Sequence, residues 1–340
     1  MSRRVAWASG THGTYLRTTD GGATWTPSQV PDAGTLDFRA VVGFSAQEAF
    51  LMSAGLGGQS RIYHTSDGGQ HWQLQFTNTN PQGFFDSMAF WDSTHGVVLG
   101  DPIPDESGKL KFEILLTDDG QNWHAIPGTQ LPDAIDGEGA FAASNTSIAL
   151  APSASDSNIW FATGGKAARV FHSADRGQTW QVSATPIVHG LDSTGIFSIA
   201  FRDATHGVIA GGDYKHPKDD GPNLAFTEDG GSTWTLSTIH PLAYFSAVAY
   251  DRRINQAAMR EQADEQRATH ESKKKVRVKP IPSERLFIVG TDFVLDLRPP
   301  NNPRRIGGKK KLELQFNAVS AYPEGGALVV GPKGSMAFIP

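Results

Sequence analysis

Three acidic residues in this chain stand where a repeated pattern otherwise has small or apolar residues, and paired acids can hydrolyse glycosidic bonds. Asp86 begins the strand-like run DSMAF, Glu138 lies in DGEGAF, and Asp213 lies in GGDYKHP. Two carboxyl groups that face one another across a cleft can serve as general acid and as nucleophile or base. Asp86, Glu138 and Asp213 are therefore the catalytic candidates of a hydrolase, provided that the fold brings two of them together.

A wider group of polar residues shares this loop character and offers a binding site rather than a reaction. Carboxylates that are held close together raise one another's pKa or attract a cation. Loops are polar in any protein, so a solvated or structural role is the simpler interpretation for each residue alone. The candidates for ligand binding are Asp86, Ser87, Asp101, Glu138, Asn145, Asp213, Tyr214, His216 and Asp292.

Most other chemistries are excluded by what the sequence lacks. The 340 residues contain no cysteine, which rules out disulfides, thiolate catalysis and cysteine-bound metals. The 11 histidines include no pair with metal-ligand spacing, and His95 and His206 fall in a repeated Thr-His-Gly turn. Glycine-rich phosphate loops, the Gly-x-Ser-x-Gly elbow and His-Glu-x-x-His are all missing. We expect neither a metal nor a cofactor.

Five further aspartates belong to a short motif that the chain repeats. Its copies read TTDGGATW (18–25), TSDGGQHW (65–72), TDDGQNW (117–123), SADRGQTW (173–180) and TEDGGSTW (227–234). An aspartate in a turn accepts hydrogen bonds from nearby backbone N–H groups, and the tryptophan adds apolar surface to bury. Five identical catalytic sites make little chemical sense, so we interpret the motif as structural. Its residues are Asp20, Trp25, Asp67, Trp72, Asp119, Trp123, Asp175, Trp180, Asp229 and Trp234, with Asp118 competing with Asp119 in the shorter third copy.

The spacing of this motif indicates the architecture that must position all these residues. Its tryptophans follow one another at 47, 51, 57 and 54 residues, a period typical of the blades of a β-propeller. In the second copy, apolar or alternating runs at 38–44, 48–55, 60–69 and 71–77 predict four strands, A to D, with the motif at the C–D turn. We therefore predict an all-β, seven-bladed propeller in a single domain.

The predicted blades cover nearly the whole chain. They span about 1–30, 38–77, 84–127, 138–183, 195–238, 244–315 and 316–340. The first blade has no sequence for strand A, and the last has none for strand D. We expect that the chain begins late, about two strands short, and that its first blade packs beside its last, unless a strand from 301–311 completes the ring.

One region interrupts the repeat and carries most of the positive charge. Residues 251–311 contain 16 Lys and Arg against 8 Asp and Glu, whereas the rest of the chain contains 14 against 27. An insertion at 251–284, with a solvated helix at 254–270, and a basic loop at 298–311 account for this charge. Only Phe287 and Phe293 are available there to stack on bases, both in apolar runs, so we expect no nucleic-acid partner. No apolar run is long enough to predict a membrane span.

The repeated motif resembles the Asp-box, or BNR repeat. Together with the Phe…His-Gly-Val…Gly runs at 86–101 and 197–213, it makes the chain similar to the photosystem II stability/assembly factor-like propellers. The resemblance covers nearly the whole chain except 251–284 and 298–311. It implies seven blades, a non-enzymatic role and an exported setting, secreted or periplasmic, with a leader absent from this sequence. Asp-boxes also occur in sialidases and xyloglucanases, but the sialidase Arg-Ile-Pro signature is absent.

A propeller has two faces, and the predicted strand order assigns the candidate residues to one of them. The D–A and B–C loops share the first, here called the loop face, and the A–B and C–D turns share the second, the box face. Loops that converge on the axis of a rigid scaffold are the usual place for binding. We predict a non-enzymatic propeller that binds a protein, a small molecule or a glycan at the loop face, with a glycoside hydrolase of the Asp-box type as the alternative.

Overall fold

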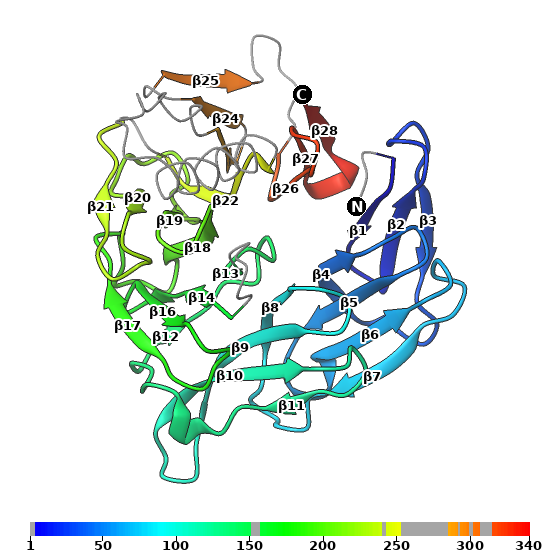
Figure 1. Ribbon diagram of the computed structural model, residues 1–340, viewed down its shortest axis with the longest axis horizontal. Helices are drawn as coiled ribbons and strands as arrows, with labels where there is room; N and C mark the ends of the chain where they lie inside the picture. Colours follow the sequence, from blue (N-terminus) through cyan, green and yellow to red (C-terminus); the bar gives the residue numbers. More distant parts are fainter. Residues whose placement is uncertain are drawn as a thin grey trace, which may run out of the picture.

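The chain folds into a ring of β-sheets. A computed structural model describes residues 4–150, 157–239, 243–252, 285–291, 293–298, 302–306 and 315–340. Within these residues the strands form seven antiparallel sheets around a central axis (Figure 1). The helical elements with described bounds are the short 3₁₀ turns η1 (Gly57–Gln59), η2 (Gly128–Gln130) and η3 (Pro332–Gly334). The predicted all-β, seven-bladed propeller is confirmed.

The first three sheets follow the predicted repeat, and the strands of the second begin within two residues of the predicted runs. Each connects neighbouring strands in sequence order, as a meander does. The strands are β1 (Ala6–Ser9), β2 (Thr14–Thr18) and β3 (Thr26–Gln29), then β4 (Asp37–Gly43), β5 (Ala49–Ala54), β6 (Arg61–Thr65) and β7 (Gln73–Thr77), then β8 (Phe85–Phe90), β9 (Gly96–Pro104), β10 (Leu110–Thr117) and β11 (His124–Ala125).

The remaining four sheets complete the ring. The fourth contains β13 (Ile148–Ala149), β14 (Ile159–Ala162), β16 (Arg169–Ser173) and β17 (Gln181–Ala184), and the fifth contains β18 (Thr194–Phe201), β19 (Gly207–Asp213), β20 (Leu224–Thr227) and β21 (Thr235–Leu236). The sixth contains β22 (Phe245–Tyr250), β23 (Leu286–Gly290), β24 (Phe293–Arg298) and β25 (Asn302–Ile306), and the seventh contains β26 (Ala318–Ala321), β27 (Ala327–Val330) and β28 (Met336–Ile339).

Two short strands extend the fifth sheet toward the loop face. β12 (Glu138–Gly139) pairs with β15 (Gly164–Gly165), and Gly164 pairs in turn with Gly195 of β18. Backbones approach this closely because Gly164 and Gly195 carry no side chain at the crossing. Glu138 therefore lies at the edge of the fifth sheet and not at the start of the fourth, whose first strand is β13.

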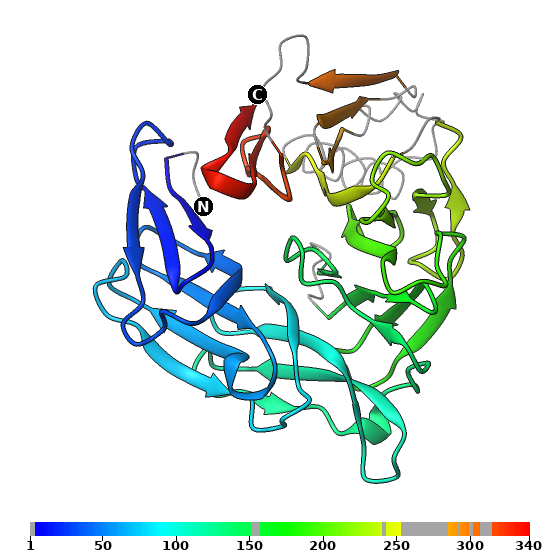
Figure 2. The ribbon, with the colours of Figure 1, turned by 180° about the vertical axis from the view of Figure 1, so that it is seen from behind.

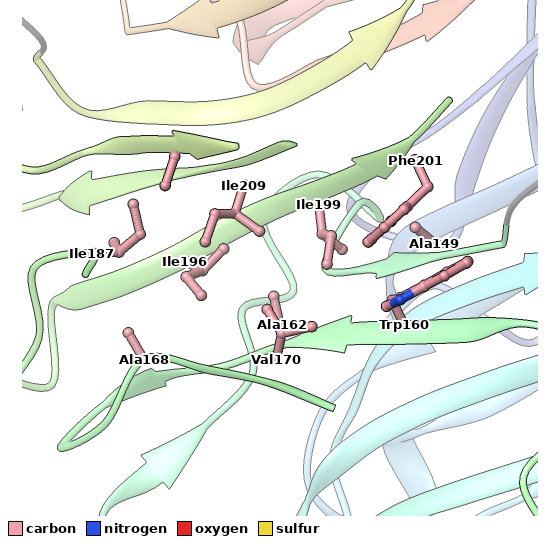
Figure 3. Close-up of a cluster of buried hydrophobic side chains, with 11 residues drawn as sticks. Ala149, Trp160, Ala162, Ala168, Val170, Ile187, Ile196, Ile199, Phe201 and Ile209 are labelled. Atoms are coloured by element: carbon pink, nitrogen blue, oxygen red, sulfur yellow. The ribbon is translucent and has the colours of Figure 1, made fainter. Parts of the chain in front are cut away.

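The core lies between blades, so each sheet buries both of its faces. This explains the unbroken apolar runs of the second strands, since β5 and β14 are buried at every position. Between the fourth and fifth blades Trp160 stacks on Phe201, with 3.8 Å between ring centroids (Figure 3). The Nε1–H of Trp160 donates to the carbonyl oxygen of Gly230 at 2.8 Å, so this fully buried side chain has no unpaired polar atom.

The repeated motif forms the same hydrogen-bonded turn in its copies. In the second, Oδ1 of Asp67 accepts the Thr65 hydroxyl at 2.9 Å and the N–H of His71 at 3.0 Å, while Gly69 donates to the Thr65 oxygen. The His71 N–H and ring lower the pKa of Asp67 to about 2. In the shorter third copy Asp119, and not Asp118, accepts the equivalent bonds.

The first and last blades lie side by side and close the ring, as predicted (Figure 2). Ala6 of β1 packs against Tyr322 and Leu328, and the ring of Phe338 covers the backbone of Gly22. Among the described residues, each of these two sheets has three strands.

The basic stretch 298–311 differs from its prediction as a loop, because 302–306 forms β25. This strand pairs with β24 as the outermost strand of the sixth blade, so it does not complete the ring at the chain ends. An outer strand tolerates Pro303, whose missing N–H costs no ladder bond at a sheet edge. The predicted helix at 254–270 and most of the insertion 251–284 lie outside the described residues. Among the described residues, the helical stretches are far too short to cross a lipid bilayer.

Candidate functional site

The innermost strands deliver a different side chain from each of several blades to equivalent places near the loop face. In the described residues, four of these strands carry a β-bulge at the same position, where one residue has no partner on the second strand. A bulge turns its extra residue away from the regular alternation. The bulged residues are Arg39 in β4, Asp86 in β8, Phe197 in β18 and Ser246 in β22.

Asp86 is the bulged residue of the third blade and is almost completely buried. Only 1% of its surface is exposed, and its Oδ2 accepts no hydrogen bond from any described residue. Burial raises the pKa of Asp86 well above its usual range, and the charge of Asp101 raises it further, against the opposing effect of Arg39. The site therefore favours the protonated form of Asp86, because an ionised carboxylate here has lost its hydration without gaining donors.

Asp101 lies beside Asp86 and is itself the extra residue of a second bulge. The pairing of β9 with β10 skips Asp101 between Gly100 and Pro102. Its Oδ1 accepts the N–H of Ala140 at 2.9 Å, and its Oδ2 has no partner among the described residues. The side chain is half-buried, and this burial raises the pKa of Asp101 to about 6 although the bond from Ala140 lowers it.

Asp101 belongs to a long β-hairpin and not to an irregular loop. β9 continues to Pro104 and β10 begins at Leu110, so only 105–109 form the turn. Pro102 fits into this strand because it lies beyond the end of β8, where no neighbour requires its N–H. Asp101 is thereby held on a rigid hairpin.

Glu138 is fully engaged in a buried ion pair. The Arg169 guanidinium donates from Nε to Oε1 at 2.9 Å and from Nη2 to Oε2. Oε1 also accepts the hydroxyl of Thr163 at 2.6 Å, and Oε2 accepts the N–H of Ile135 at 2.9 Å. The Glu138 side chain has no exposed surface. A catalytic acid needs an oxygen within reach of the substrate, whereas this geometry fastens the loops of the fourth and fifth blades together.

Ser87 and Asn145 connect the innermost strands of the third and fourth blades. The Ser87 hydroxyl lies 2.5 Å from the hydroxyl of Ser147, and both are fully buried. Oδ1 of Asn145 accepts the N–H of Met88 at 2.7 Å, and its Nδ2 donates to the carbonyl oxygen of Met88 at 3.1 Å. The side chain of Asn145 therefore pairs with backbone groups on the inner edge of β8. The φ of Asn145 is +58°, which lies in the left-handed region.

Residues 213–216 form a compact turn at the end of β19. Oδ2 of Asp213 lies 2.8 Å from Nδ1 of His216, and Oδ1 accepts the N–H of Lys215 at 2.9 Å. Burial alone would raise the pKa of Asp213, but bonds from His216, Ser193 and Lys215 outweigh it and lower the pKa. The same Asp213 bond raises the pKa of His216. The turn presents Tyr214 to solvent, with 46% of its surface exposed.

Tyr214 is the outer member of an aromatic cluster that spans the fourth to sixth blades. Phe141 stacks on the bulged Phe197 with 3.8 Å between ring centroids, and Tyr244 meets Phe197 edge-on at 4.8 Å. Tyr214 stands edge-on to Phe141 at 6.5 Å and to Phe197 at 6.0 Å. The ring of Phe141 lies over Gly164, where any side chain would collide with it.

Sequence reasoning found Tyr214 but missed four other residues of this region, namely Arg39, Phe141, Phe197 and Tyr244. A signal was available in the alignment of the innermost strands, FRAVV, FDSMAF, IFSIAF and FSAVAY. In each run the bulged residue comes directly before an alanine or a serine. Arg39 and Phe197 therefore align with Asp86. Phe141 carries no such signal because it comes from the irregular segment before β13.

The predicted site residues thus divide into three groups. Asp86 and Asp101 lie close enough for the charge of Asp101 to raise the pKa of Asp86, and Ala140 donates to Asp101. Glu138 is held by Arg169, and Asp213 by His216, so neither forms a free carboxyl pair with Asp86. Asp292 lies outside the described residues. In the described part of the chain, no three His, Asp or Glu side chains gather in a way that could hold a metal ion.

Solved structures with the same fold include two of YCF48. YCF48 bound to a D1 peptide matches with a TM-score of 0.63 and 17% identity over 99% of this chain and 90% of that one. YCF48 from Cyanidioschyzon merolae matches with a TM-score of 0.60 and 17% identity over 99% and 91%. At this identity the likeness shows the fold alone, and that fold is the one that the Asp-box resemblance implied.

An enzyme shares part of the architecture. An ancestral GH74 enzyme matches with a TM-score of 0.52 and 14% identity over 87% of this chain but only 35% of its own length. No model of a protein family matches the sequence, and no curated protein matches it. Because one fold carries both a protein solved with a bound peptide and an enzyme, function has to be argued from the site.

Proposed function

We propose that this propeller binds a segment of another protein on its loop face, over the fourth and fifth blades. The observation that carries the proposal is a group of exposed apolar side chains: 44% of Ile135, 58% of Leu191 and 46% of Tyr214 is accessible. Exposed apolar groups that are gathered on one face mark interaction sites, whereas scattered ones do not.

Backbone hydrogen bonds join the loops that carry these side chains into one surface. The N–H of Lys166 donates to the carbonyl oxygen of Gly137, and the N–H of Gly190 donates to that of Gly165. The N–H of Tyr214 donates to the carbonyl oxygen of Ser193 at 3.2 Å. The loops at 135–138, 164–166, 190–194 and 213–216 therefore hold one another in place, which lowers the entropy that binding would otherwise cost.

Two observations favour binding over catalysis: a structure with this fold holds a peptide, and two of the candidate acids are paired. YCF48 has been solved with a bound D1 peptide, so a propeller of this fold accepts a peptide. Of the three catalytic candidates, Glu138 is neutralised by Arg169 and Asp213 is bonded to His216. A protein partner thus agrees with both the fold and the state of the acids.

The glycoside hydrolase alternative retains one observation in its favour. Burial raises the pKa of both Asp86 and Asp101, and a raised pKa is what a general acid at neutral pH requires. A panel of aryl glycosides and glycans tests it directly. Turnover by the wild type that is lost in Asp101→Asn would replace the binding proposal with hydrolysis.

The binding proposal is tested by selecting peptides against the immobilised protein from a display library. Selected peptides are then titrated against the wild type, Tyr214→Ala and Leu191→Ser. We expect each substitution to weaken binding by roughly tenfold or more, as truncation of a buried apolar anchor does. Leu236→Ser is the matched control, because Leu236 is 40% exposed on the outermost strand of the fifth blade, away from the loop face. Equal losses in all three variants, or none, would contradict the proposed surface.

A further inference from the structure

The two carboxyl groups at the bulges of the third blade form a layered acidic site. Asp101 is half-buried and keeps Oδ2 without a partner among the described residues. Asp86 is the deeper member, 1% exposed, and its own Oδ2 is buried and unpartnered. Buried polar atoms are nearly always hydrogen-bonded, so the buried Oδ2 of Asp86 indicates a missing group. Asp101 is mainly ionised at neutral pH, and an ionised carboxylate can only accept, so a group that binds its Oδ2 must be a donor.

The aromatic cluster, here called the aromatic wall, is joined to this acidic site through the backbone of residues 140–141. Ala140, whose N–H binds Asp101, is followed directly by Phe141, which stacks on Phe197 and meets the exposed Tyr214 edge-on. Aromatic rings attract cations, and long basic side chains pack their methylene stems on apolar surface while the charged end remains hydrated or paired. A carboxylate beside such a wall is complementary to a lysine or arginine side chain.

Two basic side chains in the described part of the chain, Arg39 and Arg169, pair with other carboxylates. The Nε of Arg39 donates to Oδ2 of Asp37 at 2.9 Å, and Arg169 is paired with Glu138. A calcium ion is a weaker occupant for Asp101, because Ca²⁺ takes six to eight oxygen ligands and the described residues bring no third acid or histidine there. Among the described residues, neither of these two guanidinium groups is paired with Asp101, and we consider a cation that another molecule supplies.

We propose that Asp101, backed by Asp86 and flanked by Phe141 and Tyr214, binds a lysine or arginine side chain of the partner segment. This inference deepens the proposed function and depends on it only for the source of the cation. The basic group donates to the free Oδ2 of Asp101, and its stem lies along the aromatic wall. The site thus selects partner segments with a basic residue among apolar ones.

The binding of a single cationic group can be measured without knowing the partner. The probe is N-acetyl-lysine methylamide, titrated into ¹⁵N-labelled protein, with N-acetyl-glutamine methylamide as the uncharged control. The amide signal of Ala140 is the local reporter, because its N–H donates to Asp101. We expect a saturable shift of this signal with the lysine probe and no saturable shift with the glutamine probe.

Two variants make the result specific. Asp101→Asn keeps the shape and the acceptor for Ala140 but removes the charge, and we expect it to weaken lysine binding by roughly tenfold or more. Asp32→Asn is the matched control, since Asp32 is an exposed carboxylate in the loop between β3 and β4, outside the proposed surface, and the affinity of this variant should equal that of the wild type. No saturation in the wild type, or equal affinity in Asp101→Asn, would overturn the inference.

The outcome is distinguishable from failure of the proposed function. Selected peptides that lose affinity in Tyr214→Ala, but tolerate replacement of every basic residue by glutamine, would uphold protein binding and overturn the cation site. A lysine probe that binds through Asp101 while no peptide is selected would uphold the cation site and contradict the proposed surface.

Discussion

Replacing Asp101 by asparagine should stabilise the folded protein at neutral pH and leave it unchanged in acid. Asparagine has the same shape, and its amide oxygen can still accept the N–H of Ala140, which lies 2.9 Å from Oδ1 in the wild type. The substitution therefore removes the ionisation and little else. It tests whether the burial of ionised Asp101 lowers the free energy of unfolding.

The magnitude follows from the pKa of Asp101, which burial raises from 3.8 to about 6. At about 1.4 kcal/mol per unit, this shift corresponds to roughly 3 kcal/mol, and access of solvent to the half-buried side chain reduces it to roughly 1–2 kcal/mol. The folded pKa is the higher one, so the folded state binds more protons between pH about 4 and 6. The free energy of unfolding therefore falls as pH rises through this window.

The assay is urea denaturation of the wild type and Asp101→Asn at pH 4, 6 and 8. We expect equal free energies of unfolding at pH 4 and an advantage of roughly 1–2 kcal/mol for the variant at pH 8. Asp136→Asn, which removes an exposed carboxylate of the same face, should show no such difference. A variant that is equally or less stable than the wild type at pH 8 would refute the reasoning, because the ionised carboxylate would then be stabilised by donors that the structure lacks.

Three other substitutions test the roles that the structure gives to its polar residues. Glu138→Gln should lower the free energy of unfolding by roughly 2–4 kcal/mol, since it leaves the Arg169 charge buried, and adding Arg169→Met should recover part of the loss; an unchanged denaturation curve would contradict the buried pair. Asn145→Ala should be less stable than Asn145→Gly by roughly 1 kcal/mol, because both lose the bonds to Met88 but only alanine is strained at a φ of +58°; the reverse order in thermal melts would refute this. Asp229→Ala should cost roughly 1 kcal/mol, like the loss of a capping residue, and the difference should vanish as pH falls from about 4 toward 2, since turn bonds lower the pKa of Asp229 to about 2; a difference that persists at pH 2 would show that packing, not the carboxylate, is responsible.

Much of the fold could be predicted from the sequence because the determinants of a blade are local. The period of the box tryptophans, such as the 54 residues between Trp180 and Trp234, predicts the blades. The turn itself is built from neighbours in sequence, since Asp229 accepts the N–H and hydroxyl of Thr233 four residues on. Because these contacts join residues that are close in the sequence, the same short pattern of residue types recurs in the copies of the repeat.

The candidate site could be predicted only in part, as a set of departures from the repeat on one face. Asp86 and Asp101 stand out because they replace small or apolar residues, and the strand order places both on the loop face. The sequence does not distinguish them from Glu138, an equally isolated acid, because its neutralising partner Arg169 is 31 residues away. Burial and pairing at that range are properties of the tertiary structure.

The sequence by itself determined the seven-bladed ring, the box turns and the face on which the exceptional residues gather. Only the tertiary structure decided which of them lie together. Two bulges place Asp86 and Asp101 close enough for the charge of one to raise the pKa of the other, and the crossing of Gly164 with Gly195 leaves room for Phe141 to stack on Phe197. The physical reason is that a repeat fixes each blade through local hydrogen bonds and apolar periodicity, whereas a site between blades depends on single side chains that occur once and meet only when the ring has closed.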